Sequence, residues 1–395
     1  MPFIERDGIP IWGEPQDNAV AQIANCQKTA DYCALMADHH LGYAVPIGGV
    51  VAYEDQVSPS GVGFDIACGN KAVLLDADAG EVRAKINTIM DDIWKEIAFG
   101  VGQKNKETVE HELFEDDPAW DIKAVGDLKD LARKQLGTVG SGNHYVDLFV
   151  DESERVWCGV HFGSRGVGHK IATHFLRLAG GEDGMNVDPA LLSVDSQEGQ
   201  EYVAGMELAG RYAYAGRDWV CAKVASILGA HILEEVHNHH NFAWRENHNG
   251  KDLWVVRKGA TPAFPGQKGF IGGSMGDISV IVQGVESEES KKALYSTVHG
   301  AGRVMSRRQA AGKFRWKRGK RIKMSEGEVS REMMMDWIDK EGVVLRGAGT
   351  DESPHCYKRL PEVLKFHEPS IEVLHTLHPI GVAMAGVHEF DPYKD

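Results

Sequence analysis

The chain has 395 residues, of which 43% are hydrophobic and 26% charged, a composition typical of a globular protein long enough to bury a large core. Its formal net charge of -15 at pH 7 argues against bulk electrostatic binding of nucleic acid. The six cysteines form no CxxC pair, which argues against a disulfide framework or a structural zinc knuckle. No basic leader and no apolar segment approaching the ~20 residues of a membrane span is evident, so we expect a cytoplasmic protein with reduced thiols.

Segments rich in β-branched residues alternate with segments of helical periodicity, and glycine clusters separate them. In chain order these patterns predict strands at residues 49–53 and 71–75, a helix at 80–97, strands at 144–150 and 156–161, a helix at 200–236, strands at 253–258 and 278–282, and a helix at 326–340. The longest helix is expected to end in one apolar face formed by Ile227, Leu228, Ile232, Leu233 and Val236. The alternation predicts a single mixed α/β domain over residues 1–395.

A glycine-bounded turn at residues 61–70, GVGFDIACGN, holds Asp65 and Cys68 three residues apart. A carboxylate and a thiolate displayed on one side of such a turn are good metal ligands. The pair alone is weak support for a metal site, because a buried cysteine commonly acts as a small hydrophobic residue. The interpretation therefore depends on further ligands elsewhere in the chain.

Histidines recur at the ends of the predicted strands and in neighbouring turns. Asn143 and His144 open one strand, His161 ends the next, and the pair His239 and His240 follows the long helical segment. Any one of these histidines alone is more often a satisfied core or surface residue than a ligand. Their accumulation in glycine- or asparagine-rich turns favours a shared metal site that includes Asp65, Cys68, His144, His161 and one of the pair His239 and His240.

Two further segments are rich in glycine. The loop at residues 257–279 ends in GGSMG, whose amides could cradle a phosphate or a purine, although glycine runs also serve as plain turns. In HGAGR, at residues 299–303, a lone imidazole precedes three residues with almost no side chain and then a guanidinium. Such an arrangement lets a ligand approach the backbone closely.

A basic segment at residues 303–323 includes the HGAGR arginine and contains no acidic residue. Its cationic residues, with Phe314 and Trp316 between them, are Arg303, Arg307, Arg308, Lys313, Arg315, Lys317, Arg318, Lys320, Arg321 and Lys323. One interpretation is a solvated surface loop, the usual fate of a run of charge. We favour contact with a polyphosphate or nucleic acid, because the interleaved rings offer bases a stacking surface.

As a set, these motifs resemble the RtcB family of RNA ligases. The motifs occur in register and in order: GVGFDIACGN, GSGNHYVDL, HFGSRGVG, HHN, RKGA, GGSMG and HGAGRVMSR. The resemblance extends from residue 36 to residue 386 and implies sheets flanked by helices around a deep metal-containing cleft. It also implies a GTP- and manganese-dependent enzyme of tRNA splicing or RNA repair, which joins an RNA 3′-phosphate or 2′,3′-cyclic phosphate end to a 5′-hydroxyl end.

The resemblance assigns a role to each motif. His299 would be the nucleophile that attacks the α-phosphorus of GTP, as a neutral imidazole can, and the phosphates would lie beside Gly300, Ala301, Gly302 and Arg303. Two Mn²⁺ ions, bridged by the thiolate, would be held by Asp65, Cys68, His144, His161 and His240. Ligand chemistry alone would suggest zinc for a thiolate with three imidazoles. The guanosine would contact Asn143, Tyr145, Asp147, Ser274, Met275 and Tyr357.

Two positions depart from the family pattern. Asp147 stands where the family usually has glutamate, so its shorter side chain must still reach the guanine donors. Met384 and Ala385 stand where many members carry a lysine that contacts guanine, and Lys394 would have to supply that charge. Weaker nucleotide binding or an altered RNA task would follow from these departures.

Candidates for RNA phosphate contacts are Arg165, His169 and the basic segment at residues 303–323. Two rival functions stay open at this point. One is a metal-dependent phosphoesterase that uses water in place of His299, and the other is an RNA-binding paralogue impaired in catalysis. The sequence itself points to no particular RNA and to no particular activating protein partner.

Overall fold

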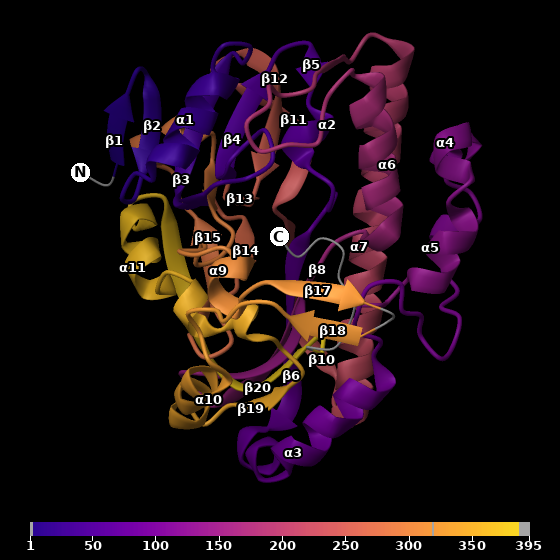
Figure 1. The fold of residues 1–395 in the computed structure, drawn as a ribbon, viewed down its shortest axis with the longest axis vertical. Coiled ribbons are helices and arrows are strands. Elements are labelled where there is room, and N and C mark those ends of the chain that lie inside the picture. Colours follow the sequence, from indigo (N-terminus) through magenta and orange to yellow (C-terminus); the bar gives the residue numbers. More distant parts are fainter. Residues whose placement is uncertain (1–2, 318–319, 387–395) are drawn as a thin grey trace.

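Two large β-sheets form the centre of the computed structural model, which describes residues 3–317 and 320–386 (Figure 1). The first sheet has the order β1 (Phe3–Arg6), β2 (Ile9–Trp12), β3 (Tyr32–His40), β4 (Ile47–Tyr53), β12 (Lys251–Lys258) and β11 (Asn241–His248). The second has the order β10 (Ile232–His239), β6 (Gly69–Asp78), β8 (Arg155–Phe162), β7 (Tyr145–Asp151), β20 (Ile371–Met384), β15 (Ser279–Gly284) and β14 (Lys268–Ile271), with β19 (Val344–Arg346) along β20. The predicted mixed α/β class is confirmed.

The second sheet nearly closes on itself. Its outer strands β10 and β14 approach each other, where the amide of Phe270 donates to Asn238 Oδ1 at 2.9 Å. Further along the same two strands, Lys268 Nζ of β14 lies 2.6 Å from Glu234 Oε1 of β10. Closure covers strand edges that would otherwise present unpaired backbone groups.

The pairing register brings the ends of several strands to one end of this sheet. Gly69 at the start of β6 lies opposite both Phe162 and His239, which end β8 and β10. Tyr145 at the start of β7 lies opposite His161 and opposite Met384 at the end of β20. Residues far apart in the sequence therefore meet at this end of the sheet.

Helices and short ladders complete the fold. The longer helices are α1 (Asp17–Cys26), α3 (Ala79–Glu96), α6 (Arg165–Leu178), α7 (Gln197–Leu228) and α10 (Arg331–Lys340). The shorter ones are α2 (Pro59–Val62), α4 (Lys123–Gly126), α5 (Lys129–Gln135), α8 (Glu288–Lys292), α9 (Arg307–Ala311) and α11 (Leu360–Leu364). The two-stranded ladders are β5 (Gln56–Val57) with β9 (Leu192–Ser193), β13 (Ala260–Pro262) with β16 (Ser296–Val298), and β17 (Phe314–Lys317) with β18 (Lys320–Lys323).

Helix α7 packs against both α6 and the second sheet, and contributes to two of the apolar clusters of the core (Figure 1). Small residues line its buried face, among them Ala209, Ala213 and Gly216. A Cβ at Gly210 would lie only 3.0 Å from the ring of Phe242. The small side chains therefore let α7 approach the strands closely enough for its longer polar residues to reach their ends.

The predicted helix at residues 200–236 is wrong at its C-terminal end. Helix α7 stops at Leu228, and Gly229 takes a left-handed φ of 65°, a conformation that caps a helix and favours glycine. The chain then enters β10, which pairs with β6, so the expected apolar helical face does not exist. Ile232 is instead 38% exposed and Leu233 63% exposed.

The other predicted elements agree with the structure. Each predicted strand falls on β4, β6, β7, β8, β12 or β15, and the helix at 80–97 is α3. The helix predicted at 326–340 begins only at Arg331, because Ser330 accepts a hydrogen bond from the amide of Met333 and caps it there. The assignment of residues 1–395 to one domain stays a prediction. In the part of the chain that is described, no helix has the length and apolar character needed to span a membrane.

Candidate active site and metal centre

A pocket of about 290 Å³ opens at the end of the second sheet where the strand ends meet. Its walls come from the turns beside β6, β7, β8, β10, β14, β16 and β20. Every residue that the sequence analysis assigned to catalysis, nucleotide binding or metal binding lines it: Asp65, Cys68, Asn143, His144, Tyr145, Asp147, His161, His240, Ser274, Met275, His299, Gly300, Ala301, Gly302, Arg303 and Tyr357. The convergence follows from the sheet register, which the sequence does not reveal.

Cys68 lies at the centre of the predicted metal-binding side chains. Its Sγ is 3.7 Å from His144 Nε2 and 3.6 Å from His161 Nε2. Two groups have donor atoms close enough to hold an ion, one formed by Cys68, His161 and His240 and the other by Asp65, Cys68 and His144. Cys68 is shared by both groups.

Hydrogen bonds orient two of these imidazoles from behind. His161 Nδ1 lies 2.6 Å from Asn70 Oδ1, and His144 Nδ1 lies 2.9 Å from the carbonyl oxygen of Val139. With Nδ1 donating, the Nε2 lone pair of each ring faces Cys68, which is the arrangement of metal-bound histidines in proteins.

The donor set fits a cation at this position. His144 Nε2 lies 3.0 Å from Asp65 Oδ2, a contact that either a proton on the ring or a cation between the two atoms satisfies. The buried Nδ1 of His240 has no hydrogen-bond partner among the described residues. Thiolate, imidazole and carboxylate groups together are the ligands that transition metals prefer.

The ionisation of the cluster also favours metal binding. Burial lowers the pKa of His161 and of His240 well below the ordinary value, which keeps both rings neutral. Burial would raise the pKa of the Asp65 carboxyl, but the hydrogen bond and charge of His144, with the charge of Arg165, bring it to about 2. Burial and Asp65 raise the pKa of the Cys68 thiol well above its ordinary range, so thiolate formation calls for a bound cation.

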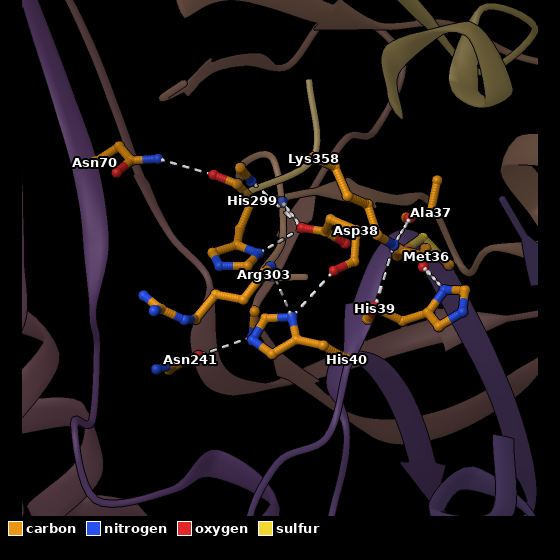
Figure 2. Close-up of polar contacts among 12 residues, drawn as sticks. Met36, Ala37, Asp38, His39, His40, Asn70, Asn241, His299, Arg303 and Lys358 are labelled. Atoms are coloured by element: carbon orange, nitrogen blue, oxygen red, sulfur yellow. Dashed lines mark hydrogen bonds and ion pairs between the residues drawn. The ribbon is translucent and has the colours of Figure 1, made fainter. Parts of the chain in front are cut away.

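His299 is oriented by a buried carboxylate from the first sheet. Asp38 Oδ2 accepts from His299 Nδ1 at 2.5 Å and from the backbone amides of His299 and Gly300 at 3.0 and 3.4 Å (Figure 2). Asp38 is fully buried. Burial would raise its pKa, but the charge and hydrogen bonds of His299, with the Lys358 ammonium, hold the pKa below the ordinary value. With Nδ1 paired to Asp38, Nε2 is the ring nitrogen of His299 that is turned away from this carboxylate.

The sequence analysis did not identify Asp38 as a site residue, although Asp38 lies within residues 36–386, the region of resemblance to the RtcB family. Its signal is a carboxylate directly after the apolar run at residues 33–37 of β3, where an unpaired charge would be costly. Lys358 Nζ donates to the carbonyl oxygens of Ala37 and His39, on either side of Asp38, at 2.9 and 3.2 Å (Figure 2). The ammonium thereby helps to neutralise the buried carboxylate.

The nucleophile candidate lies directly beside the metal-binding cluster. The ring centroids of His299 and His240 are 4.8 Å apart, and those of His240 and His161 are 5.1 Å apart. Gly302 completes this corner with a left-handed φ of 77°, and a Cβ there would lie 2.1 Å from the carbonyl oxygen of Asp38. Glycine is therefore required for the HGAGR turn to close against β3.

Arg303 is held at the pocket wall by an acidic segment before α11. Its Nη1 donates to the hydroxyl of Tyr357 at 2.8 Å, its Nη2 donates to the carbonyl oxygen of Asp351 at 2.7 Å, and its guanidinium lies over the Tyr357 ring. The Tyr357 hydroxyl donates in turn to Glu352, which also pairs with Arg307. The network fixes the position of Arg303. In the same network, the hydroxyl of Tyr357 is hydrogen-bonded to Arg303 and Glu352.

Two buried polar atoms of the pocket lining have no partner in the described part of the chain, and one of them belongs to Tyr145, whose ring stacks on His161. Tyr145 Oη and Asp147 Oδ1 are buried and have no hydrogen-bond partner among the described residues. Burial raises the pKa of the Asp147 carboxyl well above its usual range. Met275 and Met384 supply apolar surface nearby in the lining. Unpaired buried polar atoms beside apolar walls are characteristic of a site awaiting a polar ligand.

Some predicted contacts lie outside this pocket. His239 faces away from it, with Nδ1 2.9 Å from Arg217 Nη2 and its ring stacked on Tyr214, which identifies His240 as the member of the pair that faces the cluster. Arg165 lies behind His144, with Nη1 3.1 Å from His144 Nδ1, and His169 stacks on Phe64.

The basic segment divides between the pocket and the β17–β18 hairpin. Arg303 and Arg307 line the pocket, whereas Phe314 to Lys317 and Lys320 to Lys323 pair as the two strands of the hairpin. Arg318 and Lys394 lie outside the described residues. Among the described residues of the segment, those that line the pocket lie at its N-terminal end.

Together, the fold and the site define a class of protein in which a carboxylate-oriented imidazole lies beside a cluster of metal-binding side chains. The chain matches the family described as "tRNA-splicing ligase RtcB" over residues 19–132 and 119–385. It belongs to this RtcB family.

Characterised relatives match along nearly their whole length. The chain is 30% identical to the RNA-splicing ligase RtcB of Escherichia coli (strain K12), over 94% of this chain and 94% of that protein. It is 31% identical to the tRNA-splicing ligase RtcB of Thermococcus kodakarensis, over 93% and 91% of the two chains. It is 32% identical to the tRNA-splicing ligase RtcB of Archaeoglobus fulgidus, over 96% and 93%.

Proposed function

We propose that the protein is a GTP- and Mn²⁺-dependent RNA ligase that joins 3′-phosphate or 2′,3′-cyclic phosphate ends to 5′-hydroxyl ends through a covalent histidine–GMP intermediate. Membership of the RtcB family supports the ligase class. The observation that carries the nucleophile assignment is the pairing of His299 Nδ1 with the fully buried Asp38, which leaves Nε2 available beside the metal-binding cluster.

In the first step, the lone pair of His299 Nε2 forms a bond to the α-phosphorus of GTP, and the bond to the pyrophosphate oxygen breaks. Asp38, which accepts a hydrogen bond from Nδ1–H, stabilises the positive charge that develops on the ring. A 2′,3′-cyclic phosphate end is first opened by water, whose oxygen bonds to the phosphorus as the bond to the 2′-oxygen breaks and the 2′-oxygen takes up a proton. In the second step, an oxygen of the RNA 3′-phosphate attacks the phosphorus of the histidine-bound GMP, and the P–N bond breaks. In the third step, the 5′-hydroxyl attacks the activated 3′-phosphate and GMP leaves.

Asp65, Cys68, His144, His161 and His240 are the residues that would hold the metal ions, with Cys68 shared between two of them. Bound cations would neutralise phosphate charge next to His299. The donor set alone would suggest zinc before manganese, since it includes a thiolate and three imidazoles. The assignment of manganese rests on the family resemblance.

The nucleotide would extend from the HGAGR turn to the part of the pocket that Tyr145 and Asp147 line. Arg303, already oriented by Tyr357 and the Asp351 carbonyl, offers a guanidinium to the phosphates. The unpaired oxygens of Asp147 and Tyr145 are suited to the donors of a guanine, with Asn143, Ser274 and Met275 along the wall. RNA phosphates would then contact Arg165, His169 and the basic segment.

Incubation with α-labelled GTP and Mn²⁺, followed by a denaturing gel, tests the proposal directly. We expect label on the parent protein and none on His299→Ala, because only a P–N bond to this ring survives denaturation in the proposed pathway. Absence of label on the parent, with release of phosphate from RNA 3′ ends, would favour the phosphoesterase alternative. Label retained by His299→Ala would show that another residue is the nucleophile.

A further inference from the structure

A fully buried arginine, Arg217, lies in the middle of α7 behind the metal-binding cluster. Its guanidinium donates to four acceptors: the carbonyl oxygens of Ala67 and Phe162 at 3.1 and 2.6 Å, His237 Nε2 at 2.7 Å and His239 Nδ1 at 2.9 Å. No carboxylate lies within ion-pair distance of Arg217 among the described residues. Its hydrogen-bond partners are therefore all neutral groups, and its guanidinium also lies over the Tyr214 ring, 5.3 Å from the ring centroid.

Three of these four acceptors adjoin a predicted metal ligand. Ala67 precedes Cys68, Phe162 follows His161, and His239 precedes His240. The three segments come from distant parts of the chain and from different strands. One planar guanidinium thus bonds to the backbone or ring immediately beside three ligand-bearing positions.

The geometry of this contact requires an arginine. A guanidinium presents five N–H donors in a fixed fork, whereas an ammonium is a compact point charge that cannot reach acceptors spread across three segments. The space is closed around it, because a Cβ at Gly69 would lie 3.1 Å from Arg217 Nη1. A cation buried without a carboxylate partner is costly, so stability alone gives little reason to place one there.

We propose that Arg217 is a positioning residue of the metal centre: it holds Cys68, His161 and His240 at coordination spacing without touching the ions or the substrate. The proposal rests on the metal binding of the proposed function. The negative charge of a metal-bound Cys68 thiolate, together with Asp65, would offset the buried guanidinium in the loaded protein. The ligand turns and the arginine would then stabilise each other.

The test compares metal affinity with stability in the full-length protein. Arg217→Lys keeps the charge but loses the fork, and His239→Phe keeps the ring that stacks on Tyr214 and Phe242 but removes one acceptor. Arg257→Lys is the matched control, because Arg257 is equally buried but bonds to Glu246, Ser296 and Leu294. The readouts are calorimetric titration with Mn²⁺, Co²⁺ titration followed by thiolate charge-transfer absorbance, and thermal unfolding without metal.

We expect Arg217→Lys to weaken Mn²⁺ and Co²⁺ binding by about 10- to 100-fold, the usual effect of losing an outer-shell partner, and His239→Phe to weaken it less. Arg257→Lys should lower the melting temperature and leave the metal affinity unchanged. Should Arg217→Lys fail to fold, His239→Phe decides the question.

If Arg217→Lys folds and binds metal with the affinity of the parent, the positioning role is overturned. If Arg217→Lys does not fold, the same result in His239→Phe overturns it. In both cases the metal centre of the proposed function stands. An equal loss of affinity in Arg257→Lys would also overturn the positioning role, because the effect would then be one of general destabilisation. A parent protein that binds neither ion would overturn the metal centre and the positioning role together.

Discussion

At the scale of single residues, the site depends on buried polar side chains, which are stable only when hydrogen bonds or opposite charges compensate for the loss of water. Asp38 has no exposure and lies among apolar residues of β3, so its charge is tolerable only because His299, two backbone amides and Lys358 surround it. The same bonds hold the His299 ring in one orientation and one tautomer. A residue that reads as an ordinary buried acid in the sequence therefore controls the proposed nucleophile.

We predict that Asp38→Asn lowers the rate of His299 guanylylation by at least about 100-fold, because an amide in place of the carboxylate no longer stabilises charge on the ring and can impose the wrong tautomer. Single-turnover labelling with α-labelled GTP measures the rate. Circular dichroism and a metal titration on the same variant check that the fold and the cluster persist. A parent-like labelling rate would contradict the role assigned to Asp38.

At the scale of elements, the end of α7 decides where β10 begins. Residues 227–236 carry an apolar pattern compatible with continued helix, but Gly229 with its φ of 65° stops the helix and sends the chain into the sheet. His239 and His240 then reach the pocket end of β10 beside Gly69. Had α7 continued, these two histidines would lie far from the strand ends that carry His144 and His161.

Gly229→Ala is expected to destabilise the protein by about 1 kcal/mol, because an alanine is strained in the left-handed conformation. No heavy atom lies within 4 Å of the position that a Cβ would take, so the loss has a backbone cause alone. Chemical denaturation measures it. Gly80→Ala, in the first turn of α3 with no left-handed φ, is the control and should cost less; equal losses would refute this account of the helix end.

At the scale of the whole molecule, the metal-binding cluster connects segments that the chain keeps far apart. Asp65, His144, His161 and His240 belong to four separate segments that meet only through the closure and register of the second sheet. An ion held by these residues cross-links elements of the fold in the way that a disulfide would. Metal binding should therefore be measurable as global stability.

At about 100 times its dissociation constant, Mn²⁺ should raise the free energy of unfolding by about 2.7 kcal/mol, since it binds the folded state alone. Thermal or chemical denaturation with and without the ion measures this gain. Cys68→Ser should abolish most of it, because the atom shared by both groups is lost. Cys356→Ser, whose hydroxyl can still donate to the carbonyl oxygen of Thr350, should keep it.

The sequence by itself indicated the candidate chemistry of this protein. The glycine turns and the Asp65–Cys68 pair could be read directly, because they depend on residue type and close spacing, whereas the other candidate ligands and the role of His299 followed from the family resemblance. Strands such as β6 and β8 were also readable, since their β-branched periodicity is local. The tertiary structure alone decided that Asp38 from β3 pairs with His299 and that Arg217 bonds beside three of the predicted ligands. These contacts depend on register, sheet closure and the end of α7, which arise from packing between distant segments rather than from any local pattern.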